Sequence, residues 1–121
     1  MAGRRLNGVD DEDLKLITLA RASRARAEAS EGAAVRDETG RTYAAATVDL
    51  PSLKLSALQV AVAMAVSSGA ESLEAAAVVT TGTVGTAKEP EGLDAVRDVS
   101  GKTATVFVAE PDGALRETIA P

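Results

Sequence analysis

The amino-acid sequence predicts an α/β fold in which helices cover the faces of a mixed β-sheet. Segments with helical and with strand patterns follow one another in the order α-β-β-α-β-α-β-β, and turn residues separate them. Neither an internal repeat nor a low-complexity linker interrupts this order. At 121 residues the chain can bury one hydrophobic core and has little room for a second. We therefore expect a single domain over residues 1–121, with residues 1–9 flexible.

The first part of the chain predicts one helix and one β-hairpin. The helix is expected over residues 10–30, because aspartates at its start can cap it, acidic residues fill its first turn and arginines lie toward its C-terminal end. The hairpin is expected over residues 32–48. Its two strands flank a turn at residues 37–40, in which Gly40 suits a positive φ angle.

The most apolar segment of the chain, residues 51–69, predicts the second helix. No charged residue follows Lys54 in this segment, and Gly69 suits the position just after the helix. The apolar residues on its several sides are Leu53, Leu55, Leu58, Val60, Val62, Met64 and Val66. A helix that is apolar nearly all round is buried on more than one face. We therefore expect it to pack on the sheet and against another subunit of a homo-oligomer.

The last part of the chain predicts the remaining strands and one short helix. A buried strand is expected over residues 72–80, a loop over residues 81–90 and a short helix over residues 91–99. A β-branched strand over residues 102–110 and a final strand over residues 114–119 are separated by a Pro-Asp-Gly turn. Together with the first three segments, these complete a mixed sheet with helices on its faces.

Composition limits the chemistry of the chain. There is no cysteine and no histidine, so disulfides, thiolate nucleophiles, sulfur ligands for zinc and the commonest general base are all missing. The segment from Gly82 to Lys88 contains spaced glycines but not the spacing of a phosphate-binding P-loop. Glu89 also follows the lysine where a P-loop has serine or threonine. A loop beside a site is therefore the better interpretation of this segment.

Charge and hydropathy limit the partners. The net charge of −5 and the presence of only one Tyr and one Phe argue against nucleic-acid binding. The arginines near the N-terminus are interpreted as a solvated helix face, and an RNA contact through them is the weaker alternative. The sequence has neither the apolar core of a signal peptide nor a segment long enough to span a bilayer. We therefore expect a cytoplasmic protein without a membrane partner.

The element order and several local motifs resemble those of the cytidine deaminase family. Residues 19–27 resemble the first helix of that family, and residues 32–49 resemble its Val-Gly-Ala-Ala hairpin with the Asn-x-Glu substrate-binding segment that follows. The resemblance covers nearly the whole chain and implies a three-layer α-β-α cytidine deaminase-like fold. Members carry Cys-Ala-Glu or His-Ala-Glu at the start of one helix and Pro-Cys-x-x-Cys at the start of the next. These motifs form a catalytic zinc site.

The resemblance places other residues at the positions of that zinc site. Ser56 falls on the first metal ligand, and Leu58 falls on the catalytic glutamate. Glu91 and Asp94 fall on the two cysteine ligands, after a proline that is kept as Pro90. Interpreted structurally, Ser56 is a residue that hydrogen-bonds at a helix start, and the two acids interact with a helix dipole. The ligand set is therefore degenerate, and we expect no zinc, no other cofactor and no catalytic residue.

The substrate segment is also altered. Thr47 and Asp49 fall on the asparagine and glutamate that hold the ribose in relatives, so the resemblance makes them candidate substrate-binding residues for a nucleoside-like small molecule. Interpreted structurally, Asp49 is a cap or turn residue. Relatives of this size form tetramers, and we expect a dimer or a tetramer.

Two functions remain open at this point. The first is a catalytically inactive cytidine deaminase-like protein, a pseudoenzyme that works as a binding or assembly module, because Leu58 cannot transfer a proton. The alternative is a nucleoside (cytidine) deaminase, or a related hydrolase of nucleosides or nucleotides, with an atypical site. Its metal would be a hard cation on the oxygens of Asp49, Glu91 and Asp94.

Overall fold

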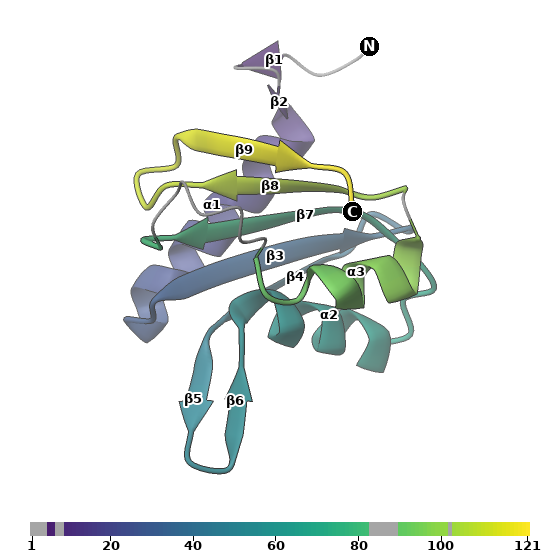
Figure 1. Ribbon diagram of the computed structural model, residues 1–121. Coiled ribbons are helices and arrows are strands. Elements are labelled where there is room, and N and C mark those ends of the chain that lie inside the picture. The colour runs from purple at the N-terminus through teal and green to yellow at the C-terminus, as the bar shows by residue number, and fades with distance from the viewer. Residues whose placement is uncertain (1–4, 7–8, 83–89, 102) are drawn as a thin grey trace.

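A mixed β-sheet forms the centre of the structure (Figure 1). The computed structural model describes residues 5–6, 9–82, 90–101 and 103–121. Among these residues the sheet has five strands, which from one edge to the other are β4 (Thr42–Ala46), β3 (Glu31–Asp37), β7 (Leu73–Thr80), β8 (Thr105–Ala109) and β9 (Leu115–Ile119). Strands β7 and β8 are parallel, and all other neighbours are antiparallel. The mixed sheet predicted from the sequence is therefore confirmed.

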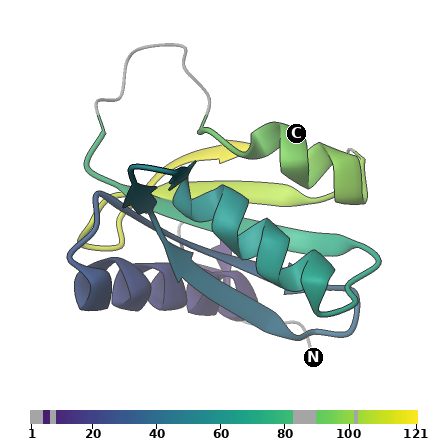
Figure 2. The same ribbon diagram turned by 90° about the horizontal axis from the view of Figure 1, so that it is seen from below.

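Helices cover both faces of this sheet (Figure 2). Helix α1 (Asp11–Ala27) packs on one face, and α2 (Ala57–Ser67) and α3 (Leu93–Ser100) pack on the other. This is the expected three-layer α-β-α arrangement, with the main elements in the predicted order. No helix in the described part of the chain is both long enough and apolar enough to cross a membrane.

The core lies on both sides of the sheet, because side chains in a strand alternate between its faces. In β7, Val78 packs toward α2 and α3, whereas Val79 packs toward α1. Helix α1 lies so close to β3 that a Cβ atom at Gly32 would collide with the carbonyl oxygen of Ala20. This contact sets the distance between the first helix and the sheet.

The structure adds two short antiparallel strand pairs to the predicted order. The pairs are β1 (Arg5–Leu6) with β2 (Val9–Asp10), and β5 (Val48–Leu50) with β6 (Leu53–Leu55). The flexible segment expected at residues 1–9 and the loop expected at residues 81–90 lie mostly outside the described residues.

The ribbon formed by β5 and β6 corrects the predicted start of the second helix. The prediction began at Pro51, but α2 begins at Ala57. Pro51 and Ser52 instead form the turn of the ribbon. Lys54 donates to the Asp49 carboxylate across the two strands at 2.7 Å. This opposite-charge pair favours the ribbon over an earlier start of the helix.

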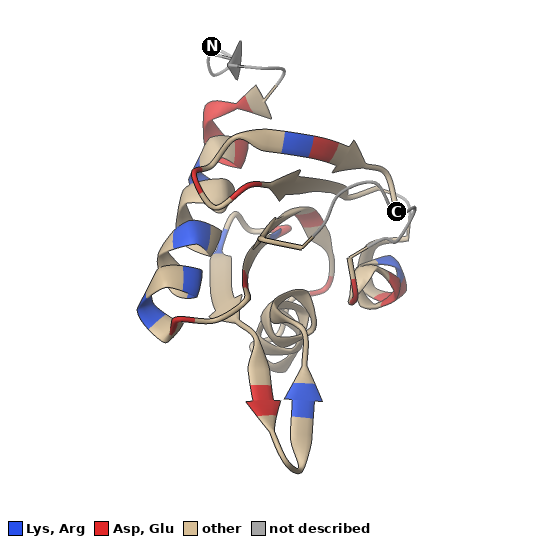
Figure 3. Ribbon diagram, turned by 60° about the vertical axis from the view of Figure 1, so that its left-hand side comes forward, with Lys and Arg blue, Asp and Glu red and all other residues tan. Residues whose placement is uncertain are grey.

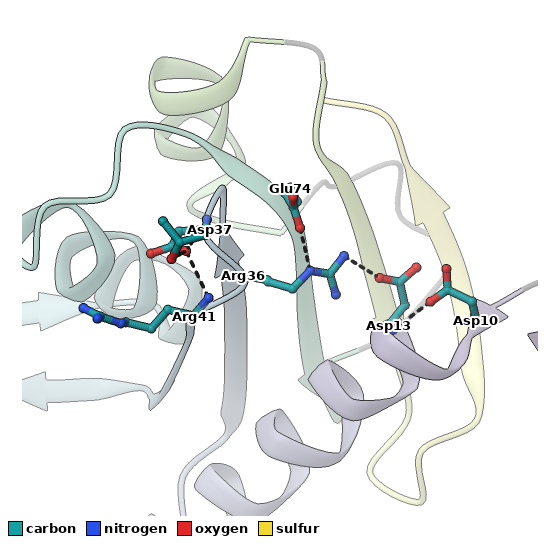
Figure 4. Close-up of polar contacts among 7 residues, drawn as sticks. Asp10, Asp13, Arg36, Asp37, Arg41 and Glu74 are labelled. Carbon is teal, nitrogen blue, oxygen red and sulfur yellow. Dashed lines mark hydrogen bonds and ion pairs between the residues drawn. The ribbon is translucent and has the colours of Figure 1, made fainter. Parts of the chain in front are cut away.

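Arg36 on β3 joins the start of α1 to the sheet (Figure 4). Its Nη2 donates to Asp13 Oδ1 at 3.1 Å, and its Nε donates to Glu74 Oε2 on β7 at 2.9 Å. Asp10 caps α1, because its carboxylate accepts the N–H of Asp13 at 3.0 Å. Burial raises the pKa of Asp13, although the bond from Arg36 acts in the opposite direction. One guanidinium therefore fastens a helix and a neighbouring strand to β3.

The hairpin of β3 and β4 turns at Asp37, as the sequence predicts. One oxygen of this carboxylate accepts the N–H of Thr39 at 2.9 Å, the hydroxyl of Thr39 at 2.6 Å and the N–H of Arg41 at 3.0 Å. The other oxygen accepts the Tyr43 hydroxyl at 2.8 Å. The hydroxyl of Thr39, with further donors from Tyr43 and the backbone, lowers the pKa of Asp37 to about 2.

This pKa predicts how the stability of the protein depends on pH. The carboxylate of Asp37 stabilises the fold above its ordinary pKa of 3.8, and the contribution is lost as the pH falls toward the folded-state pKa of about 2. Asp37→Asn should therefore lower the free energy of unfolding at neutral pH and flatten its decline between about pH 4 and pH 2. Urea denaturation at a series of pH values measures both effects. Asp98→Asn, at an exposed aspartate of α3, is the matched control, and parallel curves for Asp37→Asn and the wild type would contradict the prediction.

Candidate functional site

The candidate site lies where the N-terminal ends of α2 and α3 come together on one face of the sheet (Figure 2). Ser56 is the N-cap of α2 and is buried. Its Oγ accepts the N–H of Gln59 at 3.1 Å, and its own N–H donates to Gln59 Oε1 at 2.9 Å. This reciprocal pair is a capping box, which satisfies two backbone donors at the helix start.

The Ser56 hydroxyl also connects the two helix starts. It donates to the backbone carbonyl of Glu91 at 2.7 Å, across 35 positions of sequence. Ser56 and Glu91 therefore do meet, as their places in the family motifs imply. They meet, however, through a hydrogen bond that uses the serine as donor, while the capping box uses it as acceptor.

Leu58 belongs to the hydrophobic core beneath this junction. Its side chain is 1% exposed and packs among residues of α2, α3 and the sheet. Gly92 lies against it, so that a Cβ atom at Gly92 would stand 3.0 Å from both Leu58 Cβ and the backbone nitrogen of Gln59. Gly92 also has a φ angle of 109°, which favours glycine. The space beneath the junction is therefore filled by an apolar side chain and the adjoining backbone.

The two acidic residues at the start of α3, Glu91 in the preceding turn and Asp94 in its first turn, face outward. Glu91 is exposed, and the Asp94 side chain is 94% exposed and accepts from Arg97 at 2.7 Å. An open concavity of about 570 Å³ lies over this region and is lined by Gln59 and residues 90–95. Its lining includes the two acidic residues Glu91 and Asp94.

The two candidate substrate-binding residues lie on neighbouring elements. Thr47 connects β4 to β3, because its Oγ1 accepts the N–H of Glu31 at 3.1 Å and lies 3.3 Å from the Ser30 hydroxyl. Asp49 is exposed on the ribbon, where the hydrogen bond and the charge of Lys54 lower its pKa. Both side chains therefore already have partners within the chain.

The residues at the degenerate ligand positions do not fit a zinc ion. Zinc in a deaminase is held by thiolates and imidazole, and this chain has neither. The hydroxyl of Ser56 is bound to protein atoms, and the carboxylate of Asp94 pairs with Arg97 near solvent. Within the described residues, no group of three His, Cys, Asp or Glu side chains is placed to hold a metal ion.

Two residues of this site are missing from the sequence-based candidates. Gln59 completes the capping box, and its signal was the Ser-x-x-Gln spacing. Gly92 permits the close contact between α3 and α2, and a glycine beside the predicted start of the short helix was the only available signal. Ser56 donates to the backbone carbonyl of Glu91, and no side chain in the sequence indicates this partner.

The fold and the paired helix starts place this chain in the class of deaminase-fold α/β domains. The family model described as cytidine deaminase-like matches residues 9–113. The chain therefore belongs to the cytidine deaminase-like family.

Solved structures support the same fold. The crystal structure of a cytidine deaminase from Burkholderia pseudomallei has a TM-score of 0.74 and 22% identity, over 88% of this chain and 90% of that chain. The crystal structure of a cytidine deaminase from Mycobacterium leprae has a TM-score of 0.59 and 17% identity, over 84% of this chain and 89% of that chain. At these identities the likeness establishes the fold alone. No curated protein sequence matches the chain.

Proposed function

We propose that this chain is a catalytically inactive member of the cytidine deaminase-like family and serves as a binding or assembly module. Deamination of cytidine by this fold needs a zinc-bound hydroxide and a carboxylate that moves protons to the base. The position of that carboxylate is occupied by Leu58, which is buried in the core and cannot transfer a proton. The observation that carries the proposal is the hydrogen bond from Ser56 to the carbonyl of Glu91, which occupies the hydroxyl at the first ligand position.

The proposal predicts that purified protein contains much less than one zinc ion per chain and does not deaminate cytidine. Metal content is measured by inductively coupled plasma mass spectrometry, and deamination by the change in ultraviolet absorbance as cytidine becomes uridine. A cytidine deaminase assayed under the same conditions shows that the assay responds. One zinc ion per chain together with turnover would overturn the proposal.

The alternative is a hydrolase of nucleosides or nucleotides with an oxygen-ligated cation at Asp49, Glu91 and Asp94. Glu91 and Asp94, two exposed acids that line an open concavity, favour it. Against it, Asp49 pairs with Lys54 and Asp94 pairs with Arg97. A ligand that binds only the folded state raises the melting temperature. A concentration-dependent rise with Mg²⁺ or Ca²⁺ that is absent in Glu91→Gln would favour this alternative.

A further inference from the structure

The edge of the sheet at β4 is open. Among the described residues no strand lies beyond β4, and its pairing with β3 is regular along its whole length. At the two ends of this pairing, the N–H of Asp37 donates to the carbonyl of Arg41, and the N–H of Thr47 donates to the carbonyl of Glu31. Along an antiparallel strand, backbone groups that point toward the partner strand alternate with groups that point away. The residues whose N–H and C=O groups point away from β3 are therefore Thr42, Ala44 and Ala46.

This edge lacks the features that usually keep a sheet from pairing with another chain. Charged side chains, proline and bulges protect such edges. The sequence of β4, Thr-Tyr-Ala-Ala-Ala, contains neither a charge nor a proline, and its pairing with β3 has no bulge. The strand at the opposite edge, β9, carries Arg116 and Glu117 and has a bulge against β8. The edge at β4 is therefore the one that can accept an added strand.

Arginines lie on the α1 side of this edge. The pair at the end of β4 is Gly32 with Ala46, and a Cβ atom at Gly32 would lie 2.8 Å from Arg24 Cβ, so the C-terminal end of α1 covers that end of the strand. Arg24 and Arg26 each donate to a neutral oxygen, and they outnumber the acidic C-cap of the helix, Glu28. Figure 3 shows basic segments along the second half of α1. This side of the edge favours acidic side chains.

The α2 side of the same edge is uncharged. Helix α2 has no charged residue and contacts mainly β4 and β3, whereas α3 contacts β7. Leu58 lies against Gly92 just before α3, and Val60, about 200° around the helix from Leu58, lies on the side toward β4. Met64 follows one turn later and is 41% exposed. This side of the edge favours apolar side chains.

We propose that β4 binds an extended segment of a partner protein in which acidic and apolar residues alternate. Its backbone extends the sheet by one strand, between the helices on the two faces (Figure 2). Successive side chains of a strand point to opposite faces, so the acidic residues lie toward the arginines of α1 and the apolar residues lie toward α2.

Charge disfavours a second copy of this chain as the occupant. An antiparallel pair of β4 strands would place the exposed Arg41 of each copy at the end where Arg24 and Arg26 of the other copy lie. Like charges in such positions repel. An acidic segment meets the opposite situation.

This inference gives the proposed binding role a class of partner. It rests on that role but not on the loss of catalysis, and the two are measured separately. Zinc content and deamination test catalysis, whereas peptide binding at β4 tests the inference.

The first test titrates the full chain with a synthetic peptide of alternating glutamate and valine, long enough to span β4. Ala44→Pro should weaken binding by about tenfold or more, because it removes an outward N–H and obstructs the edge. Proline is tolerated in an edge strand where its nitrogen faces solvent. Ala44→Ser is the matched control, since it keeps the N–H and should bind as the wild type does. Circular dichroism checks that both variants are folded.

The charge of the partner is tested in the same titration. Arg26→Glu should weaken binding by about fivefold, because an attraction becomes a repulsion. Arg97→Glu makes the same change on α3, on the other face of the sheet, and should bind the peptide as the wild type does. A peptide of alternating lysine and valine should bind more weakly than the glutamate peptide.

Hydrogen exchange of the backbone locates the peptide without any substitution. The amides of Thr42, Ala44 and Ala46 should exchange rapidly in the free chain and slowly with the glutamate peptide. The amides of Tyr43 and Ala45 point toward β3 and serve as internal controls, protected in both states.

Several results would overturn the proposal. These are no binding of the glutamate peptide, equal binding of the lysine peptide, equal weakening by Ala44→Ser or Arg97→Glu, or unchanged exchange at the three outward amides. Sedimentation that shows a dimer of the wild type and a monomer of Ala44→Pro would assign the edge to a second copy instead.

Discussion

Gly32→Ala is expected to lower the free energy of unfolding by about 3 kcal/mol, or to prevent folding altogether. The added Cβ atom would collide with the carbonyl oxygen of Ala20 and would lie 2.8 Å from Arg24 Cβ and 2.9 Å from the backbone nitrogen of Arg24. Two of these three atoms belong to the backbone of α1, which cannot move aside as the end of a flexible side chain can. The helix would have to move away from β3, and packing along that whole face of the sheet would loosen.

Urea denaturation of Gly32→Ala against the wild type measures this effect. Gly40→Ala is the matched control, because Gly40 has a φ angle of 89° and no atom within 4 Å of the site of an added Cβ. It should cost about 1 kcal/mol through backbone strain alone. If Gly32→Ala and Gly40→Ala lowered the free energy of unfolding equally, the contact between α1 and β3 would not limit the packing.

Leu58→Glu, which places a carboxyl group at the position of the family's catalytic residue, is expected to destabilise the fold by about 3–5 kcal/mol at neutral pH. The leucine is 1% exposed and packs among apolar side chains, so a carboxylate there would lose its hydration without gaining a partner. We therefore expect no deaminase activity from this variant, because the substitution damages the core before it can supply a proton.

The pH dependence of the same variant separates loss of hydration from loss of packing. Burial raises the pKa of a carboxyl group above its unfolded value of about 4.3, so the destabilisation should grow as the pH rises and shrink as it falls. Leu58→Met keeps the volume without the charge and should cost less than about 1.5 kcal/mol. A Leu58→Glu protein as stable as the wild type at neutral pH would show that this position is open to solvent or to an unseen partner.

Local patterns along the chain predict most of the fold. The acidic start and basic end of α1, the turn before Gly40 and the nearly continuous apolar run of β7 depend on neighbouring residues, which a single sequence displays directly. The start of α2 is harder, because Leu53 and Leu55 suit an apolar helix as well as a ribbon. The pair of charges across the two strands favours the ribbon, and it is visible only once the register of the strands is known.

The candidate site is less accessible to sequence reasoning. Its residues are named through a family resemblance, and their contacts join distant segments through backbone atoms. The carbonyl of Glu91 accepts a hydrogen bond whatever side chain the residue carries, so no composition or spacing indicates it. Thr47 likewise fastens the edge of the sheet through the backbone of Glu31, a contact that only the paired strands create.

The bond between Tyr43 and Asp37 makes the hairpin an optical reporter of the whole chain. The protein has one tyrosine and no tryptophan, so its intrinsic fluorescence comes from a single phenol. In the folded state that phenol donates to a carboxylate at 2.8 Å, an arrangement that quenches emission and that unfolding abolishes. The denaturation of the variants that keep Asp37 can therefore be followed without attaching a dye.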